Sequence, residues 1–375
     1  MECMTTKLRF NLHIGIVLVF TLMILLFSPF QSKAQLGDFG DMLLGGIDDG
    51  EKLASEFLQP FGSGFGADIN TGWVNNASTH STLGFSLNIK VSGALSPTAA
   101  RTYDVNNVDL NRMRLADPNG ESITQTVSGS TDDGPMMEAV VGEDETVVSS
   151  FPMPEGLGLR VIPAAMIQGN VGIGLDTELM IRYFPPVINV DDMFVGLMGA
   201  GLKHEINQHI PGGDLWPVTI TLMGGYTNLT ATFDEFTMEP EDYNRVSPHN
   251  TEDFPASTWE GQELTFTNNS WNANILVGHD LPAVSFYGGF GIEGSDMEIL
   301  AEGNYPFIEP DPTPEEPERT RLASQADPID LSIDGTNEFR AILGTQLRFG
   351  MGYFSLEYTY SDYQAINGGF GVTFR

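Results

Sequence analysis

The sequence contains a single cysteine, Cys3, among its 375 residues. It lies in an N-terminal segment that we expect to be removed, so the mature chain would hold no disulfide, no thiolate metal site, no nucleophilic cysteine and no acylated cysteine. Secreted domains often depend on disulfides for stability. Their absence here favours a fold that needs no cross-link, such as a sheet closed on itself by hydrogen bonds.

Basic residues are also scarce, with 17 Lys and Arg against 50 Asp and Glu and a net charge of −33. Such an acidic chain repels phosphates, which argues against nucleic acid as a partner. The histidines show no metal-binding spacing, and no Gly-x-Ser-x-Gly motif occurs. We therefore predict no enzyme activity, no metal and no cofactor. An enzyme whose side chains come from neighbouring strands stays as an alternative, because spacing along the chain does not test it.

Only one long apolar run is present, from residue 14 to residue 27. Lys7 and Arg9 precede it, and Ser32-Lys33-Ala34 supplies the small residues that a signal peptidase reads. This pattern predicts a secretory signal peptide over residues 1–34, with an uncleaved anchor helix as the alternative. No later segment approaches 18 consecutive apolar residues, so a membrane crossing after Gln35 would have to use strands.

Alternation of apolar and polar residues is the dominant pattern in the rest of the chain. Between Thr82 and Ser92 every second residue is apolar, which is the period of a strand with two different faces. About ten residues is also the length of a transmembrane strand. The pattern predicts strands over 67–75, 82–93, 159–170, 175–185, 193–205, 216–230, 263–278, 283–294, 336–349, 352–362 and 366–374. A soluble β-sandwich is the alternative.

The gaps between these strands alternate between short and long, and the long gaps are acidic. Residues 95–157, 231–262 and 295–335 hold 30 acidic residues. Outer-membrane barrels have short periplasmic turns and long external loops. We therefore predict an antiparallel transmembrane β-barrel of about 12 strands, within a range of about 10–14, over residues 67–375. The loops 94–158, 231–262 and 295–335 are expected outside, and turns at 76–81, 171–174, 206–215, 279–282, 350–351 and 363–365 in the periplasm.

An odd number of predicted strands draws attention to residues 35–66, because bacterial barrels usually have an even number. Either one strand is missing from the prediction, or the segment before the first strand crosses the lumen as a plug. A helix is predicted from Asp48 and Asp49, through residues 50–59, to Pro60 and the glycines after it. Its plug residues would be Leu53, Phe57 and Leu58. A loose N-terminal tail is the alternative.

Several charged residues fall on the inward-facing positions of the predicted strands. They cannot face lipid, where a central Lys or Arg costs roughly 2–4 kcal/mol. Two interpretations stay open: a ladder of cross-strand salt bridges that fills the lumen, or a constriction that selects solutes. The residues are Glu178, Arg182, Lys203, Glu205, Arg340, Arg348 and Glu357.

Four motifs resemble an uncharacterised family of outer-membrane β-barrels of Bacteroidota. They are residues 66–73, 83–87, 177–185 and 199–206. A helical N-terminus before a barrel is more distantly similar to the long-chain fatty-acid transporter family, which implies a plugged lumen. The chain departs from that family in its smaller number of strands and in ending with Arg375 after Phe374.

These observations predict an outer-membrane protein in contact with lipid. We predict a channel or transporter for small solutes, hydrophobic ones included. The alternative is a structural or surface-binding barrel whose acidic loops bind divalent cations or partners.

Overall fold

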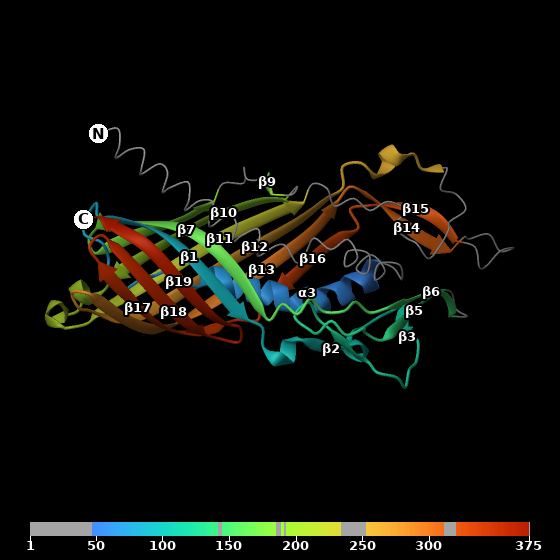
Figure 1. Ribbon diagram of the computed structural model, residues 1–375, viewed down its shortest axis with the longest axis horizontal. Helices are drawn as coiled ribbons and strands as arrows, with labels where there is room; N and C mark the ends of the chain where they lie inside the picture. Colours follow the sequence, from blue (N-terminus) through green and yellow to red (C-terminus); the bar gives the residue numbers. More distant parts are fainter. Residues whose placement is uncertain are drawn as a thin grey trace.

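A computed structural model describes residues 47–141, 145–184, 189–190, 193–233, 253–310 and 320–374. Within these ranges, one antiparallel sheet has 12 strands, and ten of them close into a barrel (Figure 1). The predicted barrel is therefore confirmed. The strand that was predicted over residues 67–75 is absent, so the ring has the even number of ten strands. The barrel strands, in order around the ring, are β1 (Phe85–Leu95), β7 (Val161–Gly174), β8 (Thr177–Phe184), β10 (Met193–Glu205), β11 (Thr219–Phe233), β12 (Glu263–Asp280), β13 (Val284–Glu302), β17 (Phe339–Phe349), β18 (Gly352–Tyr360) and β19 (Gln364–Phe374).

The two ends of the barrel differ. One end, which we call the turn end, carries the connections 175–176, 206–218, 281–283 and 350–351 together with Phe374. The opposite loop end carries the longer connections. The predicted periplasmic turn at 363–365 is wrong, because the β18–β19 connection lies at the loop end, one strand away from 350–351. The usual asymmetry of outer-membrane barrels predicts that the turn end faces the periplasm.

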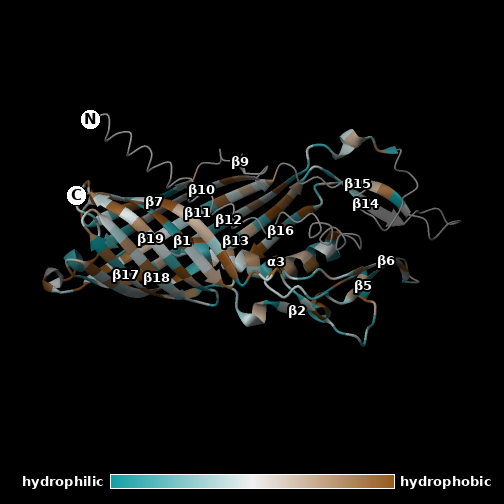
Figure 2. Cartoon of the chain, in the orientation of Figure 1, coloured by the Kyte–Doolittle hydropathy of each residue, from teal (hydrophilic) through white to brown (hydrophobic). Residues whose placement is uncertain are grey.

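The alternation of the strands separates two environments. On β1, Phe85, Leu87 and Val91 are exposed on the outer face, while Asn88 and Lys90 are buried on the inner face. Hydrophobic and hydrophilic residues alternate along the strands (Figure 2), and many of the large hydrophobic side chains of the barrel strands are exposed. Aromatic rings pack on one another around its turn end, including Phe85 on Phe374 with centroids 4.8 Å apart. Such a girdle is typical of a membrane interface.

The helix α3 (Ile47–Asn70) lies inside the ring, against strands on several sides of it (Figure 1). It is longer than the predicted helix, and residues 67–75 are its last turn and the segment after it rather than a strand. The glycines do not end it. A Cβ at Gly62 would lie 2.9 Å from the Ile333 side chain, and one at Gly66 would collide with Ser295, so glycine lets the helix fit a narrow lumen. The helix ends before Gly72, whose φ is +69°.

Short elements cap the loop end. The predicted loops 94–158 and 295–335 therefore contain strands, and β13 continues to Glu302, beyond the predicted start of its loop. The signal peptide, most of 231–262 and the proline-rich stretch after Pro310 lie outside the described residues. The elements are β2 (Thr102–Asp104), β3 (Met113–Leu115), β4 (Ile123–Gln125), β5 (Met136–Val141), β6 (Thr146–Pro152), β9 (Asn189–Val190), β14 (Asn304–Pro310), β15 (Thr320–Ala326) and β16 (Ile329–Asp334), with 3-10 turns at Thr98–Ala100, Val105–Asn107 and Ala256–Trp259. Two further 3-10 turns, Asn207–His209 and Gly213–Leu215, lie in the β10–β11 connection at the turn end.

An apolar core joins this cap to the helix. Leu53, Phe57 and Leu58, the predicted plug residues, are buried in the same cluster as Met137 and Phe151 of the cap. None of the described helices is both long enough and apolar enough to cross a bilayer. The part of the molecule at the loop end is therefore a packed unit built around α3.

Candidate functional site in the barrel lumen

The seven predicted lumen residues all lie on inward-facing positions. Glu178, Arg182, Lys203, Arg340 and Glu357 are almost fully buried, while Glu205 and Arg348 near the turn end are half-buried. The prediction missed Lys90 and Glu293, which are also buried and inward-facing. Both stand on the polar side of a predicted strand, so the alternation alone was enough to find them.

The first group of contacts surrounds the C-terminal end of α3. Arg182 donates from Nη1 to the carbonyl oxygen of Ile69 (2.5 Å) and from Nη2 to that of Thr71 (2.8 Å). Its guanidinium carbon lies 3.8 Å from the centroid of the Trp73 ring. Arg340 Nη1 donates to the carbonyl oxygen of Asn70 at 2.9 Å. Two cations thus meet the negative end of the helix dipole, where positive charge is stabilising.

The segment after the helix, residues 71–80, runs on toward the turn end without regular secondary structure. Glu357 accepts hydrogen bonds from the Gly72 N–H (2.8 Å) and the Tyr287 hydroxyl (2.8 Å). Lys90 donates to the carbonyl oxygens of Gly72 and Val74, the latter at 3.2 Å. Side chains of the barrel wall therefore bind both donors and acceptors of the backbone.

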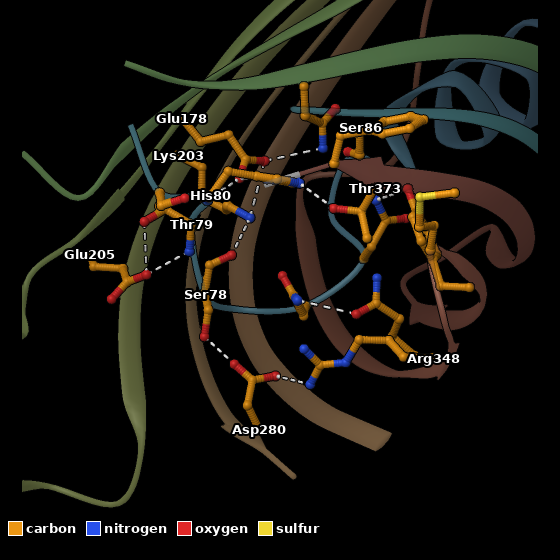
Figure 3. Close-up of a pocket in the computed structure, with 18 of the residues that line it drawn as sticks. Ser78, Thr79, His80, Ser86, Glu178, Lys203, Glu205, Asp280, Arg348 and Thr373 are labelled. Carbon is orange, nitrogen blue, oxygen red and sulfur yellow. Dashed lines mark hydrogen bonds and ion pairs between the residues drawn. The ribbon is translucent and has the colours of Figure 1, made fainter. Parts of the chain in front are cut away.

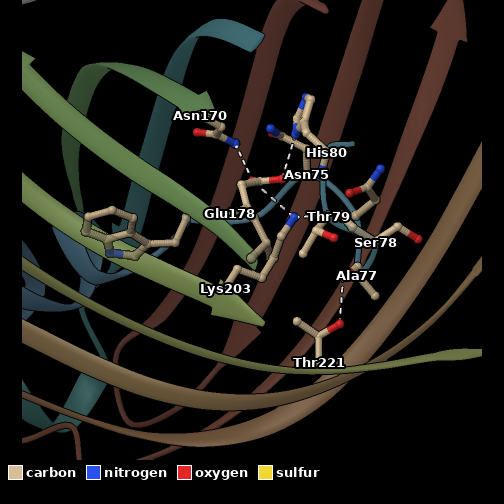
Figure 4. Close-up of polar contacts among 12 residues, drawn as sticks. Asn75, Ala77, Ser78, Thr79, His80, Asn170, Glu178, Lys203 and Thr221 are labelled. Atoms are coloured by element: carbon tan, nitrogen blue, oxygen red, sulfur yellow. Dashed lines mark hydrogen bonds and ion pairs between the residues drawn. The ribbon is translucent and has the colours of Figure 1, made fainter. Parts of the chain in front are cut away.

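A second cluster holds the end of the segment at the turn end (Figure 4). Glu178 Oε2 accepts from the backbone N–H of His80 (2.9 Å) and lies 2.6 Å from its Nδ1. Lys203 pairs with Glu178 Oε1 (3.2 Å) and donates to the carbonyl oxygen of Ser78 (2.7 Å). Glu205 accepts from the N–H of Thr79 at 2.5 Å.

Together these contacts satisfy the backbone of a segment that forms no ladder of its own. Between Ile69 and His80, barrel side chains bind eight carbonyl oxygens and three N–H groups. Buried backbone groups need such partners, because an unpaired one is costly. The charged lumen thus serves mainly to bind residues 69–80, although ion pairs also occur, as between Arg340 and Glu293 (3.0 Å) and between Arg348 and Asp280 (3.4 Å).

Next to this segment, a cavity of about 830 Å³ opens at the turn end of the barrel (Figure 3). Ser86 lines it, and its hydroxyl is buried without a hydrogen-bond partner among the described residues. In the part of the chain that the structure describes, no three His, Cys, Asp or Glu side chains are grouped so that they could hold a metal ion. The cavity is lined by carboxylates (Asp176, Glu178, Glu205, Asp280), cations (Lys203, Arg348), amides (Asn75, Asn76, Asn170, Gln346) and hydroxyls (Ser78, Thr79, Ser86, Tyr353, Thr373).

The other end of α3 is anchored in the cap. The Asp49 carboxylate accepts from the backbone N–H groups of Asn111 (2.9 Å), Arg112 (2.6 Å) and Met113 (3.0 Å). Nearby, burial and then the charge of Glu56 raise the pKa of Tyr103 above its ordinary value. Residues 47–80, which we call the plug, are therefore held at the loop end, in the middle of the lumen and at the turn end.

Comparison with known proteins gives a family and a general likeness. A family model described as a family of unknown function (DUF6588) matches residues 13–374, whereas no curated protein matches. Among solved structures, similarity is found to the translocator domain of autotransporter NalP from Neisseria meningitidis, with 12% identity, a TM-score of 0.25 and coverage of 79% of this chain and 90% of that one.

Two further solved structures are similar over most of their length. Ail, the attachment invasion locus protein of Yersinia pestis, is 7% identical, with a TM-score of 0.22 and coverage of 78% of this chain and 99% of Ail. The Ralstonia pickettii toluene transporter TbuX is 9% identical, with a TM-score of 0.23 and coverage of 85% and 99%. TM-scores and identities this low carry no argument about activity, and the fold rests on the closed antiparallel barrel described above. The likeness to fatty-acid transporters stays a prediction.

Proposed function

This chain belongs to the family of unknown function DUF6588, and we propose that it is a plugged outer-membrane channel for small polar solutes. One observation carries the proposal. The half of the lumen nearest the turn end is filled by an irregular segment, and hydrogen bonds attach this segment to the wall. The channel is closed while residues 71–80 stay in place. It conducts when this segment moves away from the wall.

Polar attachment suits a segment that leaves and returns. Each hydrogen bond within a protein contributes only about 0.5–1.5 kcal/mol net, because water replaces the lost partner. Lys90, Arg182 and Glu357 would face a hydrated lumen once the segment leaves, and water would solvate them. The helix α3 differs, because Leu53 and Phe57 are packed in an apolar core at the loop end. We therefore place the movement in residues 71–80.

The solute class follows from the cavity at the turn end. Its lining combines carboxylates, amides and hydroxyls with two cations, and Tyr353 is one of its few aromatic rings. Such groups bind polar molecules by hydrogen bonds, and a volume of about 830 Å³ lies in the ordinary range of small-molecule sites. We therefore favour polar solutes over the hydrophobic ones that the sequence left open.

A reversible cross-link tests the proposal on the full mature chain. Thr71 is the first residue of the segment, and its Oγ1 lies 2.9 Å from the Oγ1 of Thr359 on β18, so the sulfur atoms of cysteines at these two positions would lie within reach of each other. The only native cysteine, Cys3, lies in the predicted signal peptide. The Thr71→Cys, Thr359→Cys double variant should therefore form one disulfide between this segment and the wall.

The readout is ion conductance in planar bilayers. We expect the oxidised variant to be silent, because the disulfide holds the segment against the wall, and openings to appear when a reductant is added. Each single-cysteine variant is the control and should behave like the unmodified chain in both conditions. A barrel that stays silent under all conditions, with normal heat-modifiable migration, would contradict a channel.

A second candidate function is a surface-binding barrel, and the folded cap at the loop end favours it. The cap shares an apolar core with α3, so the barrel holds it in a fixed place. Its acidic residues would bind divalent cations or a partner protein. This candidate predicts a silent barrel whose cap becomes more resistant to protease when calcium is added.

A further inference from the structure

The outer face of the barrel has a gap in its apolar cover. Neighbouring strands place five outward residues in one row: Leu202, Gly224, Ala273, Ile292 and Phe339. Large side chains stand at both ends of the row, but its second and third positions, Gly224 and Ala273, have no side chain larger than a methyl group. The wall is therefore thinner at Gly224 and Ala273 than on either side along the row.

An adjoining row forms one wall of a groove. Leu222, Ile275 and Phe290 are paired across the strands on the side of the turn end, and all three are exposed. Together with Leu202, Ile292 and Phe339 they line an open groove of about 730 Å³, a volume within the range of small-molecule sites.

Two properties of the groove identify what fills it. Its walls are apolar and belong to the belt that faces the bilayer, so its occupant comes from the membrane. His204, at the corner nearest the turn end, is the one ionisable side chain among the lining residues. A second imidazole stands beside it, since His204 Nε2 and His209 Nε2 are 3.0 Å apart.

Hydrogen bonds orient the first imidazole. Thr177 Oγ1 lies 3.0 Å from the carbonyl oxygen of Leu175, to which it donates its only hydrogen, and 2.9 Å from His204 Nδ1. The Nδ1 atom therefore carries a hydrogen that the threonine oxygen accepts. This bond fixes the His204 ring with Nε2 toward His209, at the level where lipid headgroups would lie. His204 Nε2 then accepts from the Nε2–H of His209, so the nitrogen left for a headgroup is His209 Nδ1, and a second proton there makes a charged N–H donor for a phosphate oxygen.

We infer that this groove binds one anionic phospholipid of the leaflet at the turn end. One acyl chain lies over Gly224 and Ala273, beside the bulky row of Leu222, Ile275 and Phe290, and the headgroup phosphate lies at the His204–His209 pair. The inference is independent of the channel proposal, because it uses only the outer face of the wall.

Retention of lipid by the full mature protein tests this. The protein is reconstituted in vesicles of equal parts phosphatidylglycerol and phosphatidylethanolamine, extracted in mild detergent and weighed by native mass spectrometry. We expect one retained phosphatidylglycerol per barrel. Ala273→Leu fills the groove and should reduce retention at least tenfold. Ala200→Leu is the matched control, because Ala200 is also exposed on the outer face but does not line the groove, and it should retain lipid normally.

The histidine pair supplies a second, separate readout. His204→Gln and His209→Gln should each reduce the preference for phosphatidylglycerol over phosphatidylethanolamine by at least threefold while the groove still accepts acyl chains. Equal retention by Ala273→Leu and Ala200→Leu would overturn the inference. So would the appearance of dimers that Ala273→Leu abolishes, because the groove would then be an interface between copies of this chain.

Discussion

Replacing Arg182 by methionine should loosen the plug, because this one side chain holds three separate parts of it. Its guanidinium donates to the carbonyl oxygens of Ile69 and Thr71 and lies against the Trp73 ring. Methionine keeps much of the apolar length of the side chain but offers no donor. The Arg182→Met variant therefore removes these contacts and leaves two carbonyl oxygens facing an apolar group.

The size of the effect follows from the contacts. A buried carbonyl without a donor costs roughly 1–3 kcal/mol, and a desolvated cation–π contact contributes about 2 kcal/mol. Removal of a fully buried charge also relieves its desolvation, which offsets several kcal/mol. We expect a net loss on the order of 2–4 kcal/mol for the plugged state. At about 1.4 kcal/mol per factor of ten, the unplugged population rises roughly 30- to 1000-fold.

A buried thiol reports this population. Ala77, within the segment, is 2% exposed and lies in an apolar cluster with Leu276 and Tyr287 of the wall, so a cysteine there is labelled only when the segment moves. Labelling of Ala77→Cys should accelerate 30- to 1000-fold in the Arg182→Met background. Arg348→Met is the matched control, because Arg348 bonds to Asp280 and other barrel residues near the turn end rather than to the plug. Unchanged labelling in Arg182→Met, or equal acceleration by both variants, would refute the reasoning.

Three other outcomes are expected. The mature protein should begin at Gln35 and separate with outer membranes, which mass spectrometry of fractionated cells checks; retention of residues 1–34 would contradict it. An epitope inserted before Ile47 should be accessible on intact cells, because this end of the plug lies at the loop end, whereas protease should not reach 279–282; labelling only in opened cells would invert the orientation. Asp49→Ala leaves the N–H groups of residues 111–113 without their acceptor, so trypsin should cut the cap at least tenfold faster, while Asp48→Ala, an exposed neighbour, should have little effect.

The strands could be predicted from the sequence because a barrel wall has two environments, and each strand records them with a period of two. The same rule misread residues 67–75. Ala67, Ile69 and Trp73 alternate with polar residues there, but the first two belong to a helix that is surrounded by the wall on all sides. Periodicity does not distinguish a helix end in a closed lumen from a strand.

The plug could be predicted only in outline. Its helix was expected, but Gly62 and Gly66 were taken as its end, although their role is close packing against β16 and β13. The partners of the lumen charges could not be predicted. Arg182 and Lys90 bind backbone carbonyl groups, and every residue has a carbonyl group, so no residue type in the sequence marks them as partners.

Hydrogen–deuterium exchange of the mature protein tests the central claim most directly, because the claim is that the wall of the barrel binds the backbone of residues 69–80. The N–H groups of Gly72, Thr79 and His80 have carboxylate partners in the lumen. The peptide that covers them should exchange far more slowly than an unstructured chain, although faster than the strands β1 and β19, and Glu357→Gln should weaken protection at Gly72 more than at His80. Complete exchange of this peptide within seconds, at the rate of an unstructured chain, would contradict the account.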